Sequence, residues 1–404
     1  MRRRNTVICR EGWYYLLVLA FVALSSILRN VNMLMVVSAI MFFTFLLSWR
    51  AAARALRGVT LQRKIPQAIR AGDVLDIQLD LQSAPSRSLF AQAGSRCLQI
   101  DETIRHLLPK SQLAKKTVHL MCWYLPRGGA EKRTYRARLL ERGIYRIGPT
   151  RIATGFPLGL IRHIRILDQG DRVVVFPRTG RLMPVFGRLF QQIQLGMRGD
   201  PLRQDRQSGD FHGLRDWREG DGRRMIHWRS TARRGTPLVR EFEQQQHQEL
   251  NLLVDLGNEE DYRDPQRCEQ VIRFAATIAS AFCRHGDGIL RMVIVGSEVT
   301  FAGGASHPRL LEEFLTLLAT VEIPPKTAQQ KKTAPSELFE EGMRCLCRPE
   351  DRARPTLILS PHVWEPAKVA TMAGDSSGNP ASGGPIRCID TNSSNFWQFF
   401  DPAE

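Results

Sequence analysis

The sequence predicts three parts: two N-terminal transmembrane helices, a small β-sandwich-like domain, and a doubly wound α/β domain. Two apolar stretches near the start predict the helices. Short alternating segments in the next hundred residues predict strands, and alternation of strands with helices after residue 249 predicts a parallel sheet. We expect a membrane hairpin at 1–57, a β-rich domain at 58–177, a connector with an Arg/Trp motif at 178–248, and an α/β domain at 249–404.

The apolar stretches read WYYLLVLAFVALSSILR at 13–29 and MLMVVSAIMFFTFLLSW at 33–49. Each apolar core is free of charge and has about 17 residues, near the lower limit for a membrane span. The short break RNVN suits a tight connection, and aromatic residues sit where interfacial anchors are expected: Trp13, Tyr14, Tyr15 and Trp49. The alternative is a helical hairpin buried in a soluble protein.

Arginines flank the two stretches unevenly. Only Arg29 lies between them, whereas the outer flanks carry Arg2, Arg3, Arg4, Arg10, Arg50, Arg54 and Arg57. The positive-inside rule therefore predicts a multi-pass protein of the cytoplasmic membrane, with both ends in the cytoplasm. A cleaved signal peptide is the rival interpretation, and it also places residues 50–404 in the cytoplasm.

The chain is strongly basic, with a formal net charge of +17 over 404 residues. Nucleic acid, anionic lipid and an acidic protein surface are the partner classes that such a charge fits. Because a membrane hairpin is predicted, anionic lipid is the favoured explanation of the positive charge. The eight cysteines are scattered, which indicates reduced thiols rather than a disulfide framework.

The β-rich region shows period-two alternation. VLDIQLDLQ at 74–82 alternates apolar and polar residues as a half-buried strand does. Further strands are predicted at 116–125, within 132–152, and at 172–178. Short strands without strong helices indicate a sandwich or barrel.

After residue 249 the pattern changes to that of an α/β domain. ELNLLVDLG reads as a buried parallel strand, and the helix that follows has Asp264 as its expected N-cap and Gly286 as its stop. The remaining expected elements are strands at 290–296, 355–360 and 386–390, a helix at 308–321, and surface loops at 324–335 and 373–385.

Residues 213–234, GLRDWREGDGRRMIHWRSTARR, are the most unusual segment. Helical spacing after Asp221 predicts that this residue caps a short amphipathic helix with Trp228 turned inward. Arg215 is expected to form charge-assisted bonds with Asp216 or Asp221. Four interpretations are open: a structural brace between the two domains, protein docking, nucleic-acid binding and catalysis.

We favour a brace whose exposed arginines, Arg218, Arg223 and Arg229 among them, face a partner protein. Acidic residues interrupt the basic field and no known nucleic-acid module is present, which argues against nucleic acid. The expected motif and docking residues are Gly213, Arg215, Asp216, Trp217, Arg218, Gly220, Asp221, Arg223, Arg224, Trp228, Arg229 and Arg233.

The sequence contains no Walker-type phosphate loop and no His-Glu-x-x-His zinc motif. Three histidines lie near the Arg/Trp segment, His212, His227 and His247, but an isolated histidine is usually a packed or solvated residue. We therefore expect a protein that is not an enzyme and needs no cofactor.

The motif resembles the DUF58 family of bacterial membrane proteins. The resemblance rests on Gly213, Arg215, Trp217, Gly220, Asp221, Arg224, Ile226, Trp228, Ala232 and Arg233, on LVREFE at 238–243, and on LERGIYRIGPTRIATGFPLGL at 140–160. It implies a von Willebrand factor A-like C-terminal domain, a MoxR-type AAA+ ATPase as partner, and an adaptor or scaffold role in protein-complex assembly or maturation. Alternatives are a nucleic-acid- or anionic-lipid-binding membrane protein and an uncharacterised enzyme; the client and the oligomeric state stay open.

Von Willebrand A domains often hold Mg²⁺ through an Asp-x-Ser-x-Ser turn after the first strand, and hard cations of this kind take oxygen ligands. Here that turn reads Asp255-Leu256-Gly257-Asn258-Glu259. Asp255 and Glu259 retain oxygens, but Gly257 supplies no hydroxyl. FAGGAS at 301–306 and ILSPHV at 358–363 offer no clear Thr or Asp. We therefore expect a degenerate site without metal.

Overall fold

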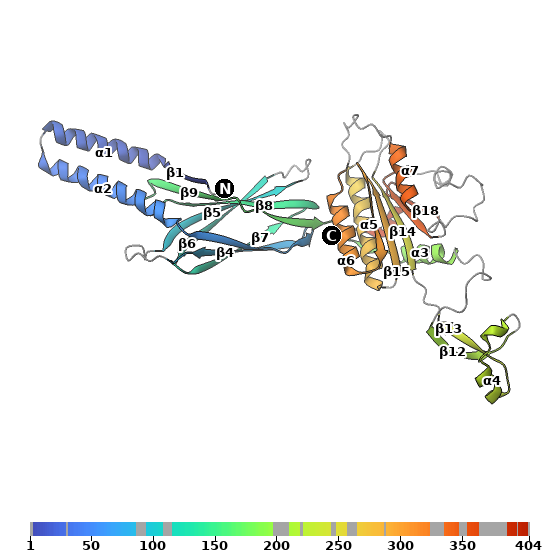
Figure 1. Ribbon diagram of the computed structural model, residues 1–404. Helices are drawn as coiled ribbons and strands as arrows, with labels where there is room; N and C mark the ends of the chain where they lie inside the picture. The colour runs from blue at the N-terminus through green and yellow to red at the C-terminus, as the bar shows by residue number, and fades with distance from the viewer. Residues whose placement is uncertain are drawn as a thin grey trace. The chain divides into compact units, whose positions relative to one another are not determined.

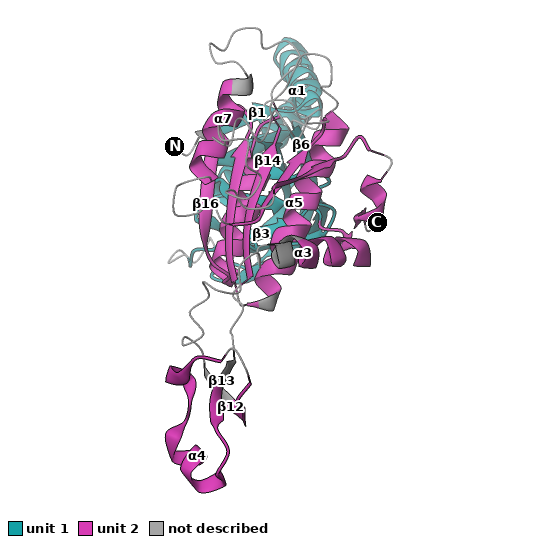
Figure 2. Ribbon diagram, turned by 90° about the vertical axis from the view of Figure 1, so that its right-hand side faces the viewer, with its two compact units in different colours: residues 1–178 teal, residues 179–404 magenta. Residues whose placement is uncertain are grey.

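The computed structural model forms two compact units, Met1–Arg178 and Thr179–Glu404, which are described separately (Figure 2). Within them the structure describes residues 3–29, 31–85, 94–107, 115–196, 210–218, 221–243, 248–256, 265–286, 288–323, 335–346, 354–362, 386–393 and 395–402.

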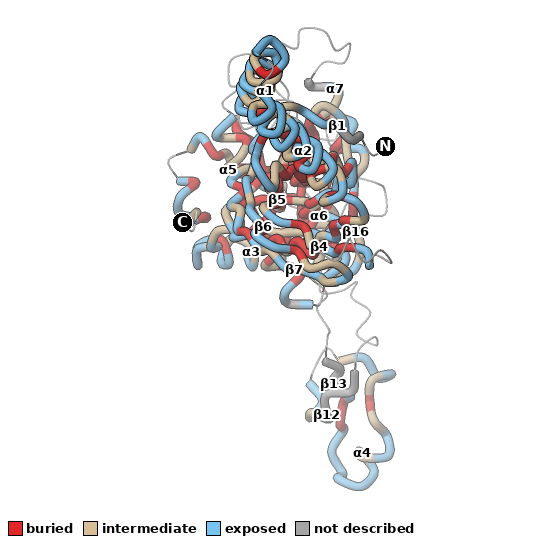
Figure 3. The backbone as a smooth tube through the Cα atoms, turned by 90° about the vertical axis from the view of Figure 1, so that its left-hand side faces the viewer, coloured by how far each residue is buried: buried red, intermediate tan, exposed pale blue. Residues whose placement is uncertain are grey.

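Two long helices begin the first unit, α1 (Arg10–Arg29) and α2 (Asn32–Ala55). By length and composition both are candidate membrane spans. Most of their large apolar side chains are exposed, and the tube through the two helices is coloured mainly as exposed (Figure 3). Members of this exposed set include Leu17, Phe21, Leu28, Met33, Ile40 and Phe43.

The residues before α1 form a strand that the sequence analysis did not foresee. Strand β1 (Arg3–Ile8) pairs antiparallel with β9 (Ile161–Leu167) over its whole length. The backbone N–H of Cys9 continues this contact by donating to the carbonyl of Leu160 at 2.9 Å. Because α2 leads directly into β2 (Val59–Lys64), both ends of the helical hairpin are built into the same unit.

The rest of the first unit consists of two sheets. The larger runs β1-β9-β8-β10-β3, with β5 also on β8 and β6 on β5, and the smaller runs β2-β4-β7. The remaining strands are β3 (Ala68–Arg70), β4 (Val74–Ser83), β5 (Ser95–His106), β6 (Lys115–Leu125), β7 (Ala130–Arg138), β8 (Gly143–Thr154) and β10 (Asp171–Phe176). The strand-rich region predicted from period-two alternation is therefore present.

One apolar core lies between the two sheets. Leu75, Ile77 and Leu79 of β4 alternate inward and share a cluster with Leu98 and Ile100 of β5. All five side chains are fully buried. Burial of this size is the main contribution to the stability of such a domain.

A buried polar network also joins the two sheets. The Arg63 guanidinium of β2 donates to Glu102 on β5, with Nε 2.7 Å from Oε1, and to the Thr150 hydroxyl at 2.8 Å. Tyr135 of β7 donates to the second Glu102 oxygen at 2.5 Å. The Asp171 carboxylate also accepts a hydrogen bond from the Arg63 guanidinium. Burial and the neighbouring Glu102 carboxylate raise the pKa of Tyr135 well above its usual range, so that its hydroxyl stays a donor.

The second unit contains a five-stranded sheet in the order β16-β15-β14-β17-β18. Its strands are β14 (Gln248–Asp255), β15 (Gly288–Val295), β16 (Val299–Ala305), β17 (Thr356–Ser360) and β18 (Ile386–Asp390). All neighbours pair in parallel except β16, which is antiparallel to β15. The sequence analysis expected the four parallel strands but predicted no strand where β16 lies.

Helices cover both faces of this sheet (Figure 1). Helices α5 (Pro265–His285) and α6 (Pro308–Thr320) lie on one face, and α7 (Pro335–Leu346) lies on the other. Leu253, Val293 and Ile358 point toward α7 and pack on Phe339 and Met343. The stop predicted for the first of these helices is confirmed, because Gly286 has a left-handed φ of 80°.

Part of the predicted connector at 178–248 is a helix. Helix α3 (Pro184–Gly196) places Phe186 edge-on to Phe274 of α5, with ring centroids 5.6 Å apart. The C-terminal residues Phe396 and Phe400 contact the same ring at 5.4 and 5.2 Å. The expected N-cap Asp264 and the loops expected at 324–335 and 373–385 lie outside the described residues, apart from Pro335, which begins α7.

Candidate functional site

The Arg/Trp segment is carried by an antiparallel hairpin, which we call the Arg/Trp hairpin (residues 210–243). Its strands are β12 (Asp210–Asp216) and β13 (Leu238–Glu243), with a register shift between Phe211 and Gly213. The connection between them holds the short 3₁₀ turn η2 (Arg223–Met225) and the helix α4 (Trp228–Arg234). Ile226 bridges back to Val239, and these two side chains are buried together with Leu238.

An ion pair fixes the connection to β12. The Arg215 guanidinium donates to both Asp221 oxygens, Nη1 at 2.6 Å and Nη2 at 2.8 Å. The backbone N–H of Arg218 donates to the same carboxylate at 2.9 Å, and the Trp217 indole donates to the carbonyl of Asp221 at 3.3 Å. The sequence analysis expected a bond from Arg215 to Asp216 or Asp221, and the carboxylate of Asp221 is the one it uses.

The prediction that Asp221 caps a helix is wrong. Both of its carboxylate oxygens are taken by Arg215 and by the Arg218 N–H, so neither reaches a helix start. The N-cap of α4 is His227, whose Nδ1 accepts from the Ser230 backbone N–H at 3.3 Å. The cap was missed because Asp is a far commoner capping residue than His.

The prediction that Trp228 is turned inward is also wrong, because 65% of this residue is exposed. Trp228 is the first residue of α4, a helix of seven residues that buries no side chain. The inward position belongs instead to Ile226, which sits in the bridge to β13. Helical spacing failed here because the turn before α4 interrupts the helix that the spacing assumed.

The outer surface of the Arg/Trp hairpin is basic and aromatic. Trp217 and Trp228 are exposed, and Asp216 is an exposed acid. The exposed arginines of the described part are Arg218, Arg223, Arg224, Arg229, Arg233, Arg234 and Arg240. A guanidinium is a planar donor that binds carboxylates through two bonds at once, so this surface suits an anionic partner.

Two glycines complete the predicted set. Gly213 is half-buried on β12, and a Cβ there would meet no atom within 4 Å. Gly220 lies outside the described residues, as do 197–209 and 244–247, through which the hairpin joins the rest of its unit. The idea that the segment braces the two domains therefore stays a prediction.

A second polar group lies at the carboxyl edge of the parallel sheet. Asp255 ends β14 and is buried. The Ser360 hydroxyl, at the end of β17, is 3.4 Å from its Oδ2, and His362 Nε2 is 3.5 Å from the same atom. His362 Nδ1 lies 2.9 Å from the Ser360 hydroxyl, which closes a compact Asp-Ser-His group.

The expectation of a degenerate site without metal at Asp255 stays a prediction. An imidazole nitrogen stands beside the carboxylate where a hard cation would need oxygen ligands. Among the described residues no three His, Cys, Asp or Glu side chains gather around one point. Glu259, the other candidate oxygen ligand, lies outside the described residues. The sequence analysis passed over Ser360 and His362, although a Ser-x-His sequence directly after a buried strand was a usable signal.

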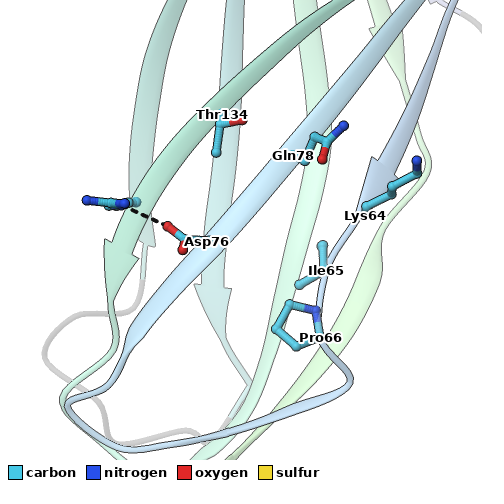
Figure 4. Close-up of a pocket in the computed structure, with 7 residues that line it drawn as sticks. Lys64, Ile65, Pro66, Asp76, Gln78 and Thr134 are labelled. Atoms are coloured by element: carbon cyan, nitrogen blue, oxygen red, sulfur yellow. Dashed lines mark hydrogen bonds and ion pairs between the residues drawn. The ribbon is translucent and has the colours of Figure 1, made fainter.

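A surface pocket lies far along the chain from both groups, on the β-rich unit (Figure 4). Its best-defined feature is the exposed ion pair of Arg136 Nε with Asp76 Oδ1 at 2.9 Å. Exposed pairs of this kind contribute about 0–1 kcal/mol. The other lining residues are Lys64, Ile65, Pro66, Gln78 and Thr134, a set without a cysteine or a histidine.

A relative and several solved structures were compared with the chain. The uncharacterized protein YeaD of Bacillus subtilis (strain 168) is 24% identical over 257 residues, a match that covers 62% of this chain and 61% of that protein. The chain thus matches somewhat less than two thirds of the relative's length.

Solved structures resemble the chain only weakly. The CARDB domain of the PF1109 protein from Pyrococcus furiosus has a TM-score of 0.18 at 12% identity, covering 29% of this chain and 91% of that domain. A β-glucosidase from Listeria innocua has a TM-score of 0.20 at 12% identity, covering 29% and 16%. TM-scores this low carry no argument about fold or function.

The family comparison coincides with the Arg/Trp hairpin. The match begins at Gly213, on β12, and extends through the first strands of the five-stranded sheet to α7. The family it identifies for residues 213–340 is DUF58, a family described as proteins of unknown function.

Proposed function

We propose that this protein is a membrane-anchored adaptor or scaffold without catalytic activity or cofactor, whose Arg/Trp hairpin docks an acidic surface of a partner protein. By the resemblance described above, the partner is a MoxR-type AAA+ ATPase, and the process is assembly or maturation of a protein complex. The observation that carries the proposal is the Arg215–Asp221 pair, which ties a connection with exposed arginines to β12.

Anchoring as a two-span hairpin in the cytoplasmic membrane is supported by the strand pairing at both of its ends. Strand β1 precedes α1 and pairs with β9, which follows α2 by a hundred residues. A chain whose two flanks form one sheet must keep both on one side of a membrane. A signal peptide cleaved after α1 would remove β1 from that sheet, so the pairing favours the uncleaved hairpin. The arginine excess on the flanks then favours the cytoplasm.

A von Willebrand A-like, doubly wound fold for the second unit is supported by its strand order. The first strand, β14, is central, later strands extend the sheet in both directions, and the edge strand β16 is antiparallel. Helices on both faces are what right-handed crossovers between parallel strands produce. Such a domain offers its loops at the carboxyl edge for binding.

Protein docking is supported by the chemistry of the hairpin surface. Tryptophan and arginine are the residue types that dominate binding energy in protein interfaces. Exposed Trp228 stands at the start of α4 and exposed Arg229 and Arg233 follow on the same helix. A surface of this composition is complementary to a carboxylate-rich partner surface that also has an apolar side chain to pack on the tryptophan.

The test uses the full chain in membranes and two charge reversals of equal size. Arg223→Glu changes the hairpin surface, and Arg188→Glu changes an exposed arginine of α3. We expect Arg223→Glu to weaken capture of a purified MoxR-type ATPase and Arg188→Glu to leave it unchanged. Equal losses from both variants would show that net charge, not this surface, drives capture. Binding of DNA or RNA that falls steeply with salt would favour the nucleic-acid alternative.

A further inference from the structure

The end of the first unit next to the helical hairpin carries an apolar loop that the proposed function does not use. This loop, Gly155–Leu160 with the sequence GFPLGL, joins β8 to β9. It lies at the end of the two sheets where α1 and α2 join them (Figure 1).

Leu160 reaches the helix pair at the level of its apolar stretches. Its side chain is buried with Phe45 of α2 and packs on Tyr15 and Leu16 of α1. Phe45 precedes the expected interface residue Trp49 by four positions, which corresponds to about 6 Å along a helix axis. The loop thus touches the hairpin inside the segment that would lie in the hydrocarbon.

The backbone of the loop is seated against α1 itself. A Cβ on Gly12 would lie 2.2 Å from the carbonyl oxygen of Leu160, so only glycine permits this approach. The same carbonyl accepts the backbone N–H of Cys9. These contacts fix the position of the loop at the start of α1.

The side of the loop away from the helices is apolar and exposed. Half of Leu158 is exposed, and the neighbouring Pro157 is exposed as well. The Arg96 guanidinium lies 5.5 Å from the ring centroid of Phe156 and 5.9 Å from that of Tyr124. Cation–π contacts of this kind tie the loop to the end of β6.

The end of β6 adds two exposed aromatic residues, Trp123 with 66% and Tyr124 with 48% of the residue exposed. This strand end is tied to the last residue of α2. Leu125 pairs with Ser95 of β5, whose hydroxyl donates to the carbonyl of Ala55 at the end of α2. A tryptophan and a tyrosine beside an arginine match the composition of a membrane interface.

We propose that this end of the first unit is an interfacial wedge, formed by Phe156, Leu158, Trp123, Tyr124 and Arg96, that inserts into the boundary between headgroups and acyl chains of a phospholipid bilayer. The proposal rests on the proposed membrane anchoring by α1 and α2. It adds a third contact with lipid and fixes which end of the β-rich unit faces the bilayer.

Charge around the wedge fits anionic headgroups. Arg10 begins α1, and Arg50, Arg54 and Arg57 surround the end of α2; all four are exposed. Basic side chains near a membrane surface each add about 1 kcal/mol of attraction to anionic lipid. The exposed acid Glu11 is next to Arg10 and offsets only part of this charge.

The opposite end of the same unit supplies a matched control. Val74 and Leu140 are as exposed as Leu158, with 49% and 56% against 50%. Ser83, the partner of Val59 just after α2, is nine positions from Val74 on β4, which corresponds to about 30 Å of strand. These side chains should therefore stay in water when the wedge touches lipid.

Photochemical labelling of the full chain tests the proposal without any substitution. The protein is reconstituted in vesicles of phosphatidylglycerol and phosphatidylcholine that contain a diazirine-bearing phospholipid, and lipid adducts are mapped by mass spectrometry. We expect adducts on α1, on α2 and on peptides with Leu158 and Trp123, and none on peptides with Val74 or Leu140.

The labelling tests the wedge and the membrane anchoring separately. Adducts on α1 and α2 without any at Leu158 and Trp123 overturn the wedge and leave the anchoring intact. Adducts missing from α1 and α2 overturn the anchoring itself.

Bromolipid quenching gives a second measure of depth. Lipids brominated near the headgroup quench the emission of nearby tryptophans. Trp123→Phe should therefore remove part of the quenched emission. Trp397→Phe, at an exposed tryptophan of the second unit, should not. Unchanged quenching in Trp123→Phe would contradict the wedge.

Discussion

Replacement of Asp221 by alanine should loosen the Arg/Trp hairpin locally. Asp221 accepts two bonds from Arg215 and one from the Arg218 backbone N–H, and its side chain is only 7% exposed. The substitution removes both acceptor oxygens, and with them all three hydrogen bonds, and leaves the guanidinium without this carboxylate. Asp216→Ala is the matched control, because Asp216 lies in the same hairpin, carries the same charge and is exposed.

The size of the effect follows from the exposure of the two partners. A hydrogen bond to a charged group contributes about 1.5–3 kcal/mol when well shielded. The Arg215 side chain is 33% exposed, so water replaces part of what the carboxylate supplied. We therefore expect a loss of about 2 kcal/mol in the local opening free energy, which corresponds to roughly 30-fold faster amide exchange.

Hydrogen–deuterium exchange of the full chain, followed by mass spectrometry, measures this loss. Peptides that cover β12, α4 and β13 should exchange faster in Asp221→Ala and at the original rate in Asp216→Ala, while peptides from α5 stay unchanged in both. If the peptides of the hairpin exchange at the same rate in the two variants, the ion pair does not hold the hairpin in its conformation. The reasoning behind the docking surface then fails as well.

Three further substitutions test other parts of the structure. Trp228→Ala should change the thermal midpoint by less than a degree or two, because the exposed ring packs little; a large drop would show that it packs in solution. Glu102→Ala should cost about 1.5–3 kcal/mol in denaturant unfolding, because it removes the buried carboxylate shared by Arg63 and Tyr135 and leaves Arg63 with Asp171 and Thr150. Glu131→Ala, in a half-exposed pair, should cost about 0–1 kcal/mol. Calorimetry should detect no micromolar Mg²⁺ binding at Asp255, and binding abolished by Asp255→Ala would contradict this.

Elements with a strong period were predictable from sequence. β4 alternates along its whole length, and α5 has an apolar stripe ended by a glycine, so both were found close to their true limits. The missed elements lack such a pattern. β16 contains Gly303 and Gly304 and reads as a loop, because its pairing to β15 rather than its own residues makes it a strand.

The Arg/Trp segment shows how a local rule can point to a residue and still assign it the wrong role. Asp221 followed by an apolar spacing fits a capped helix, and that rule considers only neighbours in sequence. The structure offers the carboxylate a stronger partner in Arg215, and the turn then places Ile226 rather than Trp228 inside. The same misreading explains why Trp228, expected to stabilise the fold, is instead available to a partner.

The strand β1 has the largest consequence of the elements that sequence reasoning missed. Its basic residues were read as a flank that orients the first helix, and nothing local marks them as a strand, because the partner β9 lies more than a hundred and fifty residues away. Once paired, β1 makes the helical hairpin an insertion within a folded sheet rather than a leader attached to it. Leu160, which packs on Phe45 of α2, and Ile161, which pairs with Ile8 of β1, are adjacent residues, so the chain joins the helical hairpin to the larger sheet at one point.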